Sequence, residues 1–468
     1  MYDTVVGLEI HAELITQTKI FCGCKTTFGA DVNTLVCPVC MGYPGALPTL
    51  NREAVVGAVK AGIALDCRIN NHSSFDRKNY FYPDSPKGYQ ITQFFEPICE
   101  SGYVKIGGKS VGIQRIHIEE DAGKLIHSGN KTHIDFNRCG VPLIEIVTDP
   151  DMASGEEAAA VAEEIALRLK QAGVCDVRME QGSLRIDVNV SVKPKGSDVL
   201  GTRTEIKNLN SFRNVARAVK SETKRQISII EKGGEVQEET MHFNEASGVT
   251  VPMRKKENYS EYRYFPEADL PLLYVSDEEI NGIKARLPEL PHHRRKRLSE
   301  VYNLNYDEVT RLTRDRDLCR YFETAAKFTP HFNLLVKFLL GEVLGSINEV
   351  ELSIGDLQIS PEVLAELINM IESGEIQRAS AKKAFVLALE RGSTPKEIAL
   401  REGLLSNNNE EEIEAAVKNT IAENGKAVTQ YKNGEEKVFG FLLGKSMKAL
   451  GGKANPETVR KILLKNLK

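Results

Sequence analysis

The sequence has no long apolar run. None of its segments reaches 18 consecutive apolar residues, so it offers no candidate for a membrane-spanning helix. Residues 1–5 begin directly with a strand-like pattern, and no basic segment followed by an apolar one precedes them, so we expect no signal peptide. These two absences predict a cytoplasmic protein.

A large excess of charge of one sign is also missing. The 468 residues include 61 Lys and Arg against 65 Asp and Glu, which gives a formal net charge of −4. Without a basic surface over the whole molecule, any contact with nucleic acid has to be local. The length predicts two to four domains, and a hydrophobic content of 41% is sufficient for their cores.

A disulfide framework is the third feature that the sequence does not support. The chain has nine cysteines, an odd number, and an intracellular protein is expected to use them as free thiols or metal ligands. Cys22 and Cys24 are followed, after a short loop, by Cys37 and Cys40, which matches the ligand pattern of a closed tetrahedral site. We predict structural Zn²⁺ there, with free thiols as the alternative. The other cysteines are isolated and are interpreted as core thiols: Cys67, Cys99, Cys139, Cys175 and Cys319.

Polar residues gather on one face of several strand-like segments. In residues 6–13, alternation places Glu9, His11 and Glu13 opposite the apolar residues, and Glu145 interrupts another apolar run. Two further segments have a polar face: Arg115, His117, Glu119 and Asp121 in the first, and Arg185, Asp187 and Asn189 in the second. Such groups on neighbouring strands indicate the floor of a metal–nucleotide site, because buried carboxylates need cations or donors. A solvated sheet face with ordinary salt bridges is the alternative.

The first 290 residues combine strand patterns with two strong helices. One helix begins at Ser154 with a capping box and ends at Gly173, and the other runs from near Ser211 to Gly233. Because helices do not separate the strands regularly, we predict an α+β fold with a mainly antiparallel sheet for residues 1–290.

A proline-rich and basic stretch at residues 288–297 marks a domain boundary. Beyond it, the patterns predict a helical domain at residues 291–405 and a tail domain at residues 406–468, with a linker or helix start at residues 407–412. From residue 413 onward, 11 Lys and Arg outnumber 5 Asp and Glu, a local net charge of +6. This charge favours a surface that binds the phosphate backbone of a nucleic acid, with solvated lysine-rich helices as the alternative.

Seven motifs are distributed over essentially the whole chain: VGLEIH (6–11), DRKNYFYPD (76–84), PKGYQ (86–90), HIEEDAGK (117–124), GTRTEIKNLNS (201–211), YRYFPE (262–267) and GKANP (452–456). Together they resemble GatB, one component of the bacterial aspartyl/glutamyl-tRNA amidotransferase GatCAB. Two departures are visible: Ala268 stands where the family usually has proline, and Lys445 and Ser446 where it usually has glutamine and valine. Both lie outside the metal-facing strands, so they concern tRNA docking and not the chemistry.

The resemblance implies a reaction on misacylated tRNA. The family converts Glu-tRNA(Gln) to Gln-tRNA(Gln), and Asp-tRNA(Asn) to Asn-tRNA(Asn). GatB uses ATP to phosphorylate the side-chain carboxylate, and ammonia from the glutamine-hydrolysing amidase GatA displaces the phosphate, while GatC is a small tether in the heterotrimer. The implied fold is a cradle related to the glutamine synthetase catalytic domain, followed by a helical domain and a tail that contacts tRNA.

Phosphorylation of a carboxylate requires Mg²⁺ and cationic side chains around the phosphates. This requirement assigns roles to the residues on the polar faces of the strand-like segments. The predicted Mg²⁺ ligands are Glu9, His11, Glu119 or Glu120, and Glu145, with Asp187 and Asn189 as second-rank candidates. Of these, Glu9, His11 and Glu145 are expected to converge on one point. The predicted catalytic residues are Glu9, His11, Lys78, Arg185, Asp187, Arg203 and Lys207. The residues predicted to bind ATP with its metal are Glu119, Glu120, Glu145, Asn189 and Glu205. Each basic residue, taken alone, has a surface salt bridge as its alternative.

Two other functions are consistent with part of the pattern. A non-catalytic tRNA-binding scaffold stabilised by zinc accounts for the cysteines and the basic tail, but leaves the strand carboxylates without a role. A glutamine-synthetase-like ligase for a free small molecule accounts for the strands, but leaves the tail without a role. ATP hydrolysis that depends on misacylated tRNA would separate both from the amidotransferase hypothesis.

Overall fold

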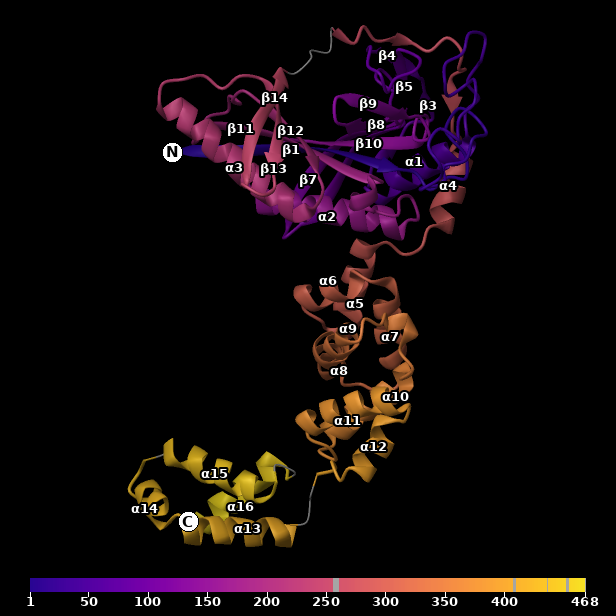
Figure 1. The fold of residues 1–468 in the computed structure, drawn as a ribbon. Helices are drawn as coiled ribbons and strands as arrows, with labels where there is room; N and C mark the ends of the chain where they lie inside the picture. The colour runs from indigo at the N-terminus through magenta and orange to yellow at the C-terminus, as the bar shows by residue number, and fades with distance from the viewer. Residues whose placement is uncertain (256–260, 407–409, 436, 452–453, 468) are drawn as a thin grey trace. The chain divides into compact units, whose positions relative to one another are not determined.

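The fold is known from a computed structural model, which describes residues 1–255, 261–406, 410–435, 437–451 and 454–467 (Figure 1). The described residues form two compact units, Met1–Pro291 and His292–Lys468. The predicted linker at residues 407–409 lies outside the described residues, as do Gly452 and Lys453 of the last family motif.

A large twisted sheet forms the centre of the first unit. Within the described residues it has nine strands. In spatial order they are β14 (Val249–Lys255), β13 (Glu239–Asn244), β12 (Thr204–Leu209), β11 (Leu184–Pro194), β1 (Tyr2–Glu13), β10 (Pro142–Thr148), β7 (Lys109–Glu120), β6 (Cys99–Ile106) and β2 (Arg68–Ile69). Neighbouring strands are antiparallel except for β12 and β13, which are parallel. The predicted α+β class with a mainly antiparallel sheet is therefore confirmed.

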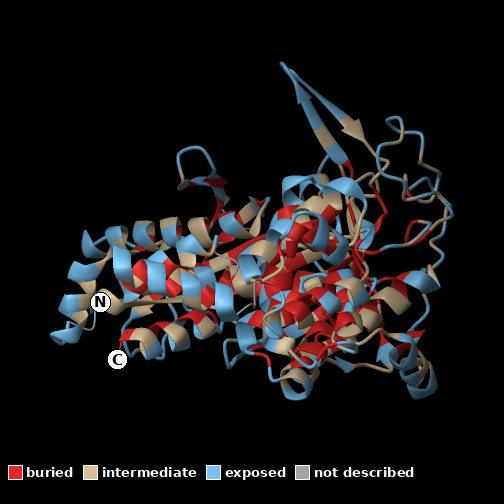
Figure 2. Ribbon diagram, turned by 90° about the horizontal axis from the view of Figure 1, so that it is seen from below, coloured by how far each residue is buried: buried red, intermediate tan, exposed pale blue. Residues whose placement is uncertain are grey.

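Three helices cover one face of this sheet. They are α1 (Arg52–Ala64), α2 (Gly155–Gln171) and α3 (Phe212–Glu231), of which α2 and α3 lie side by side (Figure 1). The apolar residues that alternate along the central strands, such as Leu8 and Ile10, are buried in the core of this unit. In Figure 2 the buried residues, in red, gather in the interior, and the outer turns of the helices are exposed. The face that carries the polar residues is consequently turned away from the helices.

The two helix starts that the sequence predicts are present. The side chain of Ser154 accepts a hydrogen bond from the Glu157 backbone N–H, and the side chain of Ser211 accepts one from Asn214. Each hydroxyl thus satisfies a backbone donor that has no partner inside its helix. Gly173, which follows the end of α2, has a φ of +68°, the left-handed conformation that ends many helices.

Smaller elements complete the first unit around the large sheet. A three-stranded sheet consists of β15 (Phe265–Pro266), β4 (Asp76–Asn79) and β5 (Tyr89–Thr92). The other small elements are the pair β3 (His72–Ser73) with β16 (Leu273–Tyr274), the hairpin β8 (Lys124–Ser128) with β9 (Lys131–Asp135), the short 3₁₀ helix Met179–Gln181, and α4 (Asp277–Arg286). The three-stranded sheet matters most here, because it brings Lys78 towards the large sheet.

The second unit is helical. Its α-helices are α5 (Pro291–Tyr302), α6 (Tyr306–Thr313), α7 (Arg316–Ala325), α8 (Phe332–Phe338), α9 (Leu344–Glu349), α10 (Pro361–Glu372), α11 (Arg378–Arg391), α12 (Pro395–Arg401), α13 (Glu410–Glu423), α14 (Gly425–Lys432), α15 (Lys437–Ala449) and α16 (Pro456–Leu467). A π-helical turn, Leu339–Val343, joins α8 to α9, and a 3₁₀ turn, Ile354–Asp356, precedes α10.

Two apolar cores lie within this second unit. One extends from Leu298 to Leu404, and the other from Ile413 to Leu467. The predicted division at residue 406 remains a prediction. Lys445 and Ser446, where the sequence departs from the family pattern, lie inside helix α15. No described helix of the chain is long and apolar enough to cross a membrane.

Candidate functional site

The strand register lines up polar residues from four strands on the open face of the sheet. On β1, His11 lies opposite Glu145 of β10 and Arg185 of β11, and Glu145 in turn lies opposite His117 of β7. Residues that are opposite each other in an antiparallel pair project from the same face at close range. Side chains that are far apart in the sequence therefore meet in one row across the sheet.

A cavity of about 540 Å³ opens over this row. Nine of the predicted site residues line it: Glu9, His11, Lys78, Glu119, Glu145, Asn189, Arg203, Glu205 and Lys207. Three predicted residues, Glu120, Arg185 and Asp187, are absent from its described lining. The cavity lies wholly within the first unit, and the three-stranded sheet contributes to its wall.

The first cluster of the site consists of His11, Glu119 and Glu145, with His117 beside them. His11 Nε2 lies 3.3 Å from Glu145 Oε2 and 3.6 Å from Glu119 Oε1. His117 Nε2 lies 3.4 Å from the same Glu145 oxygen and 3.7 Å from Glu119 Oε2. One ligand atom from each of His11, Glu119 and Glu145 lies within 4.8 Å of the others, a spacing that allows all three to contact one cation.

Charge coupling within this first cluster is strong. Burial alone would lower the pKa of His11, but the Glu145 carboxylate, through its charge and its hydrogen bond, and the Glu119 carboxylate raise it to about 9. The pKa of His117 is raised against the same burial effect, mainly by Glu145. Burial opposes ionisation of Glu145 as well, yet the two imidazoles hold its pKa well below its usual range. Without a bound ion, the two carboxylates are therefore balanced by imidazolium protons.

The second cluster consists of Glu9, Asp187 and Glu205, and it already contains a cation. The Lys207 ammonium lies 3.1 Å from Glu205 Oε1 and 3.2 Å from Asp187 Oδ2. Asn189 donates a hydrogen bond of 2.9 Å to Glu9 Oε1. Although burial lowers the pKa of Lys207, Asp187 and Glu205 raise it above its ordinary value. The expected group of Glu9, His11 and Glu145 is thus divided, because Glu9 lies with Asp187 and Glu205.

Glu120 points away from the first cluster. Consecutive residues of a strand project from opposite faces, and Glu120 follows Glu119 on β7. Its carboxylate pairs with the Lys87 ammonium and accepts a 2.9 Å hydrogen bond from the Ile91 backbone N–H. It lines a separate pocket of about 230 Å³, so of the two alternatives for the ligand the geometry brings Glu119 to His11.

The predicted basic residues occupy different positions. Arg185 donates a 2.8 Å hydrogen bond to Asp121, which directs its guanidinium away from the cavity. Arg203 lies at the exposed rim, 3.3 Å from Glu238. Lys78 reaches the cavity with its Nζ 4.9 Å from the centre of the Tyr262 ring. Lys78, Arg203 and Lys207 are therefore the predicted cations that can face a ligand in the cavity.

The sequence did not predict the aromatic groups of the cavity wall or the Gln93 amide. Phe94 and Tyr264 stack with their ring centres 4.0 Å apart, and the Arg115 guanidinium lies 5.9 Å from the Phe94 ring. Gln93 is fully buried, and its side-chain oxygen accepts a hydrogen bond from Ile118 N–H. Among the described residues, Gln93 Nε2 and His117 Nδ1 have no hydrogen-bond partner. Buried donors of this kind are expected where a bound ligand completes the site.

His117 could have been predicted as a site residue from the sequence, because it lies on the same alternating face as Glu119. Phe94, Tyr262 and Tyr264 had no such signal. They lie in irregular segments beside β5 and β15, and tertiary packing alone brings them to the cavity.

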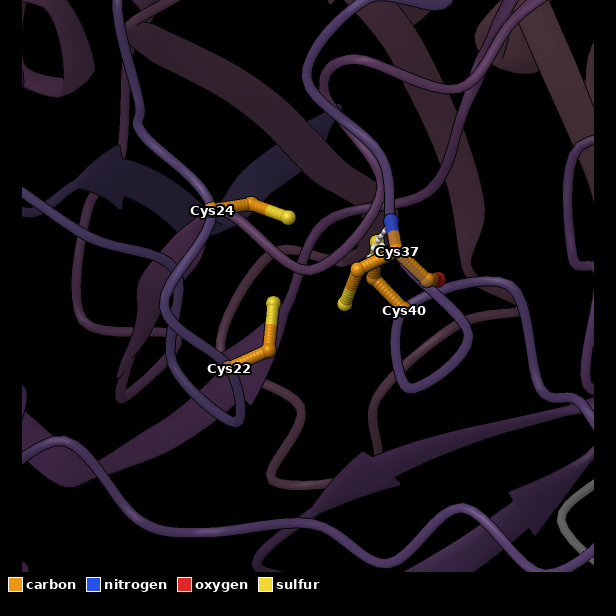
Figure 3. Close-up of side chains that lie close together, drawn as sticks. All are labelled: Cys22, Cys24, Cys37 and Cys40. Atoms are coloured by element: carbon orange, nitrogen blue, oxygen red, sulfur yellow. Dashed lines mark hydrogen bonds between the residues drawn. The ribbon is translucent and has the colours of Figure 1, made fainter.

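The four clustered cysteines converge at one point outside this cavity. Figure 3 shows the sulfur atoms of Cys22, Cys24, Cys37 and Cys40 pointing towards one another. All four lie within 4.8 Å of one another, and the sulfurs of Cys37 and Cys40 are 3.9 Å apart. Tetrahedral Zn²⁺ with bonds of about 2.3 Å separates its sulfur ligands by about 3.8 Å, so the residues fit this ion. The site would be closed, since four thiolates fill the coordination shell.

Comparisons with known proteins identify the family of the chain. A family model described as the GatB/GatE catalytic domain matches residues 4–281, more than half of the chain, and a GatB domain model matches residues 320–467. The chain belongs to the GatB family. Both acidic clusters and the four cysteines fall inside the catalytic-domain match of this family.

Relatives of known name are similar over their whole length. The B subunit of the aspartyl/glutamyl-tRNA(Asn/Gln) amidotransferase from Caldicellulosiruptor saccharolyticus is 48% identical, with 100% of this chain and 99% of that protein covered. The proteins of the same name from Clostridium tetani and Thermoanaerobacter sp. (strain X514) are each 47% identical, with 99% and 100% of this chain and 98% and 99% of those proteins covered. The GatB-family relation therefore extends over both units.

Proposed function

We propose that this chain is the component of a tRNA-dependent amidotransferase that activates the side-chain carboxylate of glutamate or aspartate esterified to tRNA(Gln) or tRNA(Asn). ATP phosphorylates that carboxylate, and ammonia from a glutaminase partner then replaces the phosphate. The family membership and the names of the relatives support this reaction class. The observation that carries the proposal is the grouping of His11, Glu119 and Glu145 at the floor of the cavity.

The chemistry explains why such a floor is needed. A carboxylate does not exchange oxygen for nitrogen at neutral pH, because its leaving group would be oxide, whereas the phosphorylated carboxylate releases phosphate. When bound, Mg²⁺ neutralises charge on the transferring phosphoryl group. Glu119 and Glu145 supply the hard oxygen ligands that this ion prefers, and His11 supplies a nitrogen ligand once its proton has left.

The second cluster has a different role in this proposal. Lys207, fixed between Asp187 and Glu205, presents its ammonium to the cavity, and Lys78 and Arg203 add two further cationic side chains. These groups can orient the phosphates and balance their charge while Asn189 holds Glu9 in place. The buried donor of Gln93 and the rings of Phe94 and Tyr264 complete the wall.

The remaining parts of the proposal concern fold, partners and zinc. The open polar face of an antiparallel sheet supports a cradle like that of glutamine synthetase, and the basic helices from residue 413 onward support tRNA binding by the tail. The relatives are named as one component of a larger enzyme, which supports assembly with the amidase GatA and the small tether GatC in a heterotrimer. The sulfur geometry supports structural Zn²⁺ at the four cysteines.

Amide formation on tRNA tests the proposal directly. The chain, assembled with its two partner proteins, is given ATP, Mg²⁺ and Glu-tRNA(Gln) or Asp-tRNA(Asn), with glutamine or ammonium chloride as nitrogen donor. We expect amidated tRNA from both donors and ADP in equal amount. Ammonium chloride bypasses the glutaminase. Amidation with ammonium chloride but not with glutamine would therefore locate a defect in the partner. Absence of tRNA-dependent ATP hydrolysis would favour a non-catalytic scaffold, and amidation of free glutamate would favour a small-molecule ligase.

A further inference from the structure

Lys19 is a charged residue that the proposed reaction does not use. It is fully buried, although lysine is among the residues most often exposed. Its Nζ lies 3.6 Å from Cys40 Sγ and 3.4 Å from the carbonyl oxygen of Phe136. Within the described part of the chain, no carboxylate oxygen comes within 4.0 Å of this ammonium. No carboxylate therefore forms a direct ion pair with Lys19, and the described groups that its ammonium contacts are the Cys40 sulfur and the Phe136 carbonyl.

The cysteine cluster can supply a counter-charge to this ammonium. Removing an ammonium from water costs several kcal/mol unless an opposite charge faces it, and a single carbonyl oxygen is a weak substitute. Four thiolates around a divalent ion carry a net double negative charge, which is itself costly to bury. Cys40, the most buried of the four ligands, also accepts a 3.2 Å hydrogen bond from the Cys37 backbone N–H. Lys19 and the metal-loaded cluster therefore stabilise each other.

We propose that Lys19 is a positioning residue of the Cys22–Cys24–Cys37–Cys40 metal site, where its ammonium donates a hydrogen bond to the Cys40 thiolate and offsets part of the cluster's negative charge. The inference rests on the zinc part of the proposed function and on nothing in the tRNA reaction. Groups that hydrogen-bond to metal ligands typically change metal affinity when they are replaced. Lys19 lines the 230 Å³ pocket together with Cys22 and Cys40, so the metal site borders that pocket.

Two substitutions and one control test this role in the full-length protein. Lys19→Met keeps the length of the side chain and removes both charge and donor, whereas Lys19→Gln keeps an N–H donor without charge. Lys25→Met is the matched control, because Lys25 follows Cys24 directly but is exposed. Zinc affinity is measured by competition with a chromogenic chelator. The sulfur-to-cobalt charge-transfer band of the Co²⁺-loaded protein reports the electron density on the thiolates.

We expect Lys19→Met to lower zinc affinity about 10- to 100-fold and to shift the charge-transfer band, because the Cys40 thiolate loses a donor. Lys19→Gln should show a smaller loss, and Lys25→Met should match the wild type in both measurements. A lysine that only fills space would leave the band unmoved. If Lys19→Met does not fold, Lys19→Gln decides between the same outcomes.

Wild-type zinc affinity and an unshifted band in the Lys19 variants would overturn the proposal. So would a wild-type protein that binds neither Zn²⁺ nor Co²⁺. The latter result would leave the tRNA amidation assay unaffected, so failure of the metal site and failure of the proposed reaction are distinguishable.

Discussion

The two acidic clusters on the open face of the sheet are built on the same strand but balance their charge in opposite ways. Glu9 and His11 are two residues apart on β1, yet each belongs to a different cluster. The Glu9 cluster holds Lys207 at 3.1–3.2 Å from two carboxylates. The His11 cluster contains imidazoles, whose positive charge depends on pH. The Glu9 cluster carries a permanent internal cation. The His11 cluster carries a proton that a metal ion can replace.

This difference leads us to expect a metal ion at the His11 cluster and not at the Glu9 cluster. Acidic groups within reach of one point suggest a metal site in both cases. An ammonium already seated among them removes much of the electrostatic attraction for a divalent ion. The His11 cluster is therefore the expected Mg²⁺ site, and the Glu9 cluster is expected to present Lys207 to an anionic ligand.

The largest effect should follow from disabling the His11 cluster. Glu145→Gln removes the carboxylate that contacts both imidazoles, and it should lower the ATP-dependent amidation rate about a thousandfold or more, since a bound metal contributes several kcal/mol to phosphoryl transfer. Glutaminase activity of the partner should persist. Glu231→Gln, an exposed change at the end of α3, is the control. Near-normal amidation by Glu145→Gln would remove this cluster from the mechanism.

Replacing Lys207 should make the Glu9 cluster behave like the His11 cluster. Lys207→Met leaves Asp187 and Glu205 buried without their ammonium, and it should lower the free energy of unfolding by about 2 kcal/mol, less than for a fully buried pair because part of the Lys207 side chain is exposed. Mg²⁺ or Ca²⁺ should restore much of this loss. Urea unfolding with and without divalent ions measures both effects. A variant as stable as the wild type, or one indifferent to divalent ions, would contradict the comparison.

The pH dependence of stability should distinguish the two clusters in the metal-free protein. The pKa of His11 is about 9 in the folded chain against about 6.5 when unfolded, so the folded state binds the extra proton between these values. Its contribution to stability, about 3 kcal/mol at most, is complete below pH 6.5 and lost as the pH rises to 9. The urea concentration at the unfolding midpoint, measured in EDTA, should fall as the pH rises across this range. In the His11→Asn variant this midpoint should change less with pH.

The same proton must leave before a metal ion can bind His11. Apparent Mg²⁺ affinity should therefore increase as the pH rises towards 9. Calorimetric titrations in buffers of different ionisation enthalpy would detect the released proton. Affinity that is independent of pH would show that His11 is not a ligand.

The smallest effect is expected at Asn189. Asn189→Ala removes the hydrogen bond to Glu9, worth about 1 kcal/mol of unfolding free energy, and touches no residue of the His11 cluster. Mg²⁺ affinity should stay at the wild-type value while the denaturation midpoint falls slightly. A marked loss of Mg²⁺ affinity would mean that the clusters act as one unit.

Local rules predicted much of the fold and part of the site. Period-two alternation identified the polar faces, and serine caps identified the starts of α2 and α3, because these patterns are written in neighbouring residues. The cysteine spacing was sufficient to bring four sulfurs together. The sequence left Glu119 and Glu120 as alternatives for the metal ligand, and only the structure brings Glu119 to His11.

Tertiary arrangement was beyond the reach of these rules. Which strands pair, and in which register, decided that Glu9 joins Asp187 and Glu205 and that His11 joins Glu145. Arg185 carries the expected charge on the expected face, but Asp121 holds it outside the cavity lining. Lys19 lies in an irregular segment with no periodic pattern, so its burial beside Cys40 had no sequence signal.

The opposite orientation of Glu119 and Glu120 constrains how β7 can change its length. A one-residue insertion between Arg115 and Glu119 would exchange the two carboxylates between the large cavity and the smaller pocket. Before Arg115 the strand already contains an extra residue, because Val147 pairs with Arg115 but Thr148 pairs with Ile113. This irregularity, together with the Gly107–Gly108 turn, can absorb insertions. Length variation among homologous strands should therefore be confined to the segment before Arg115.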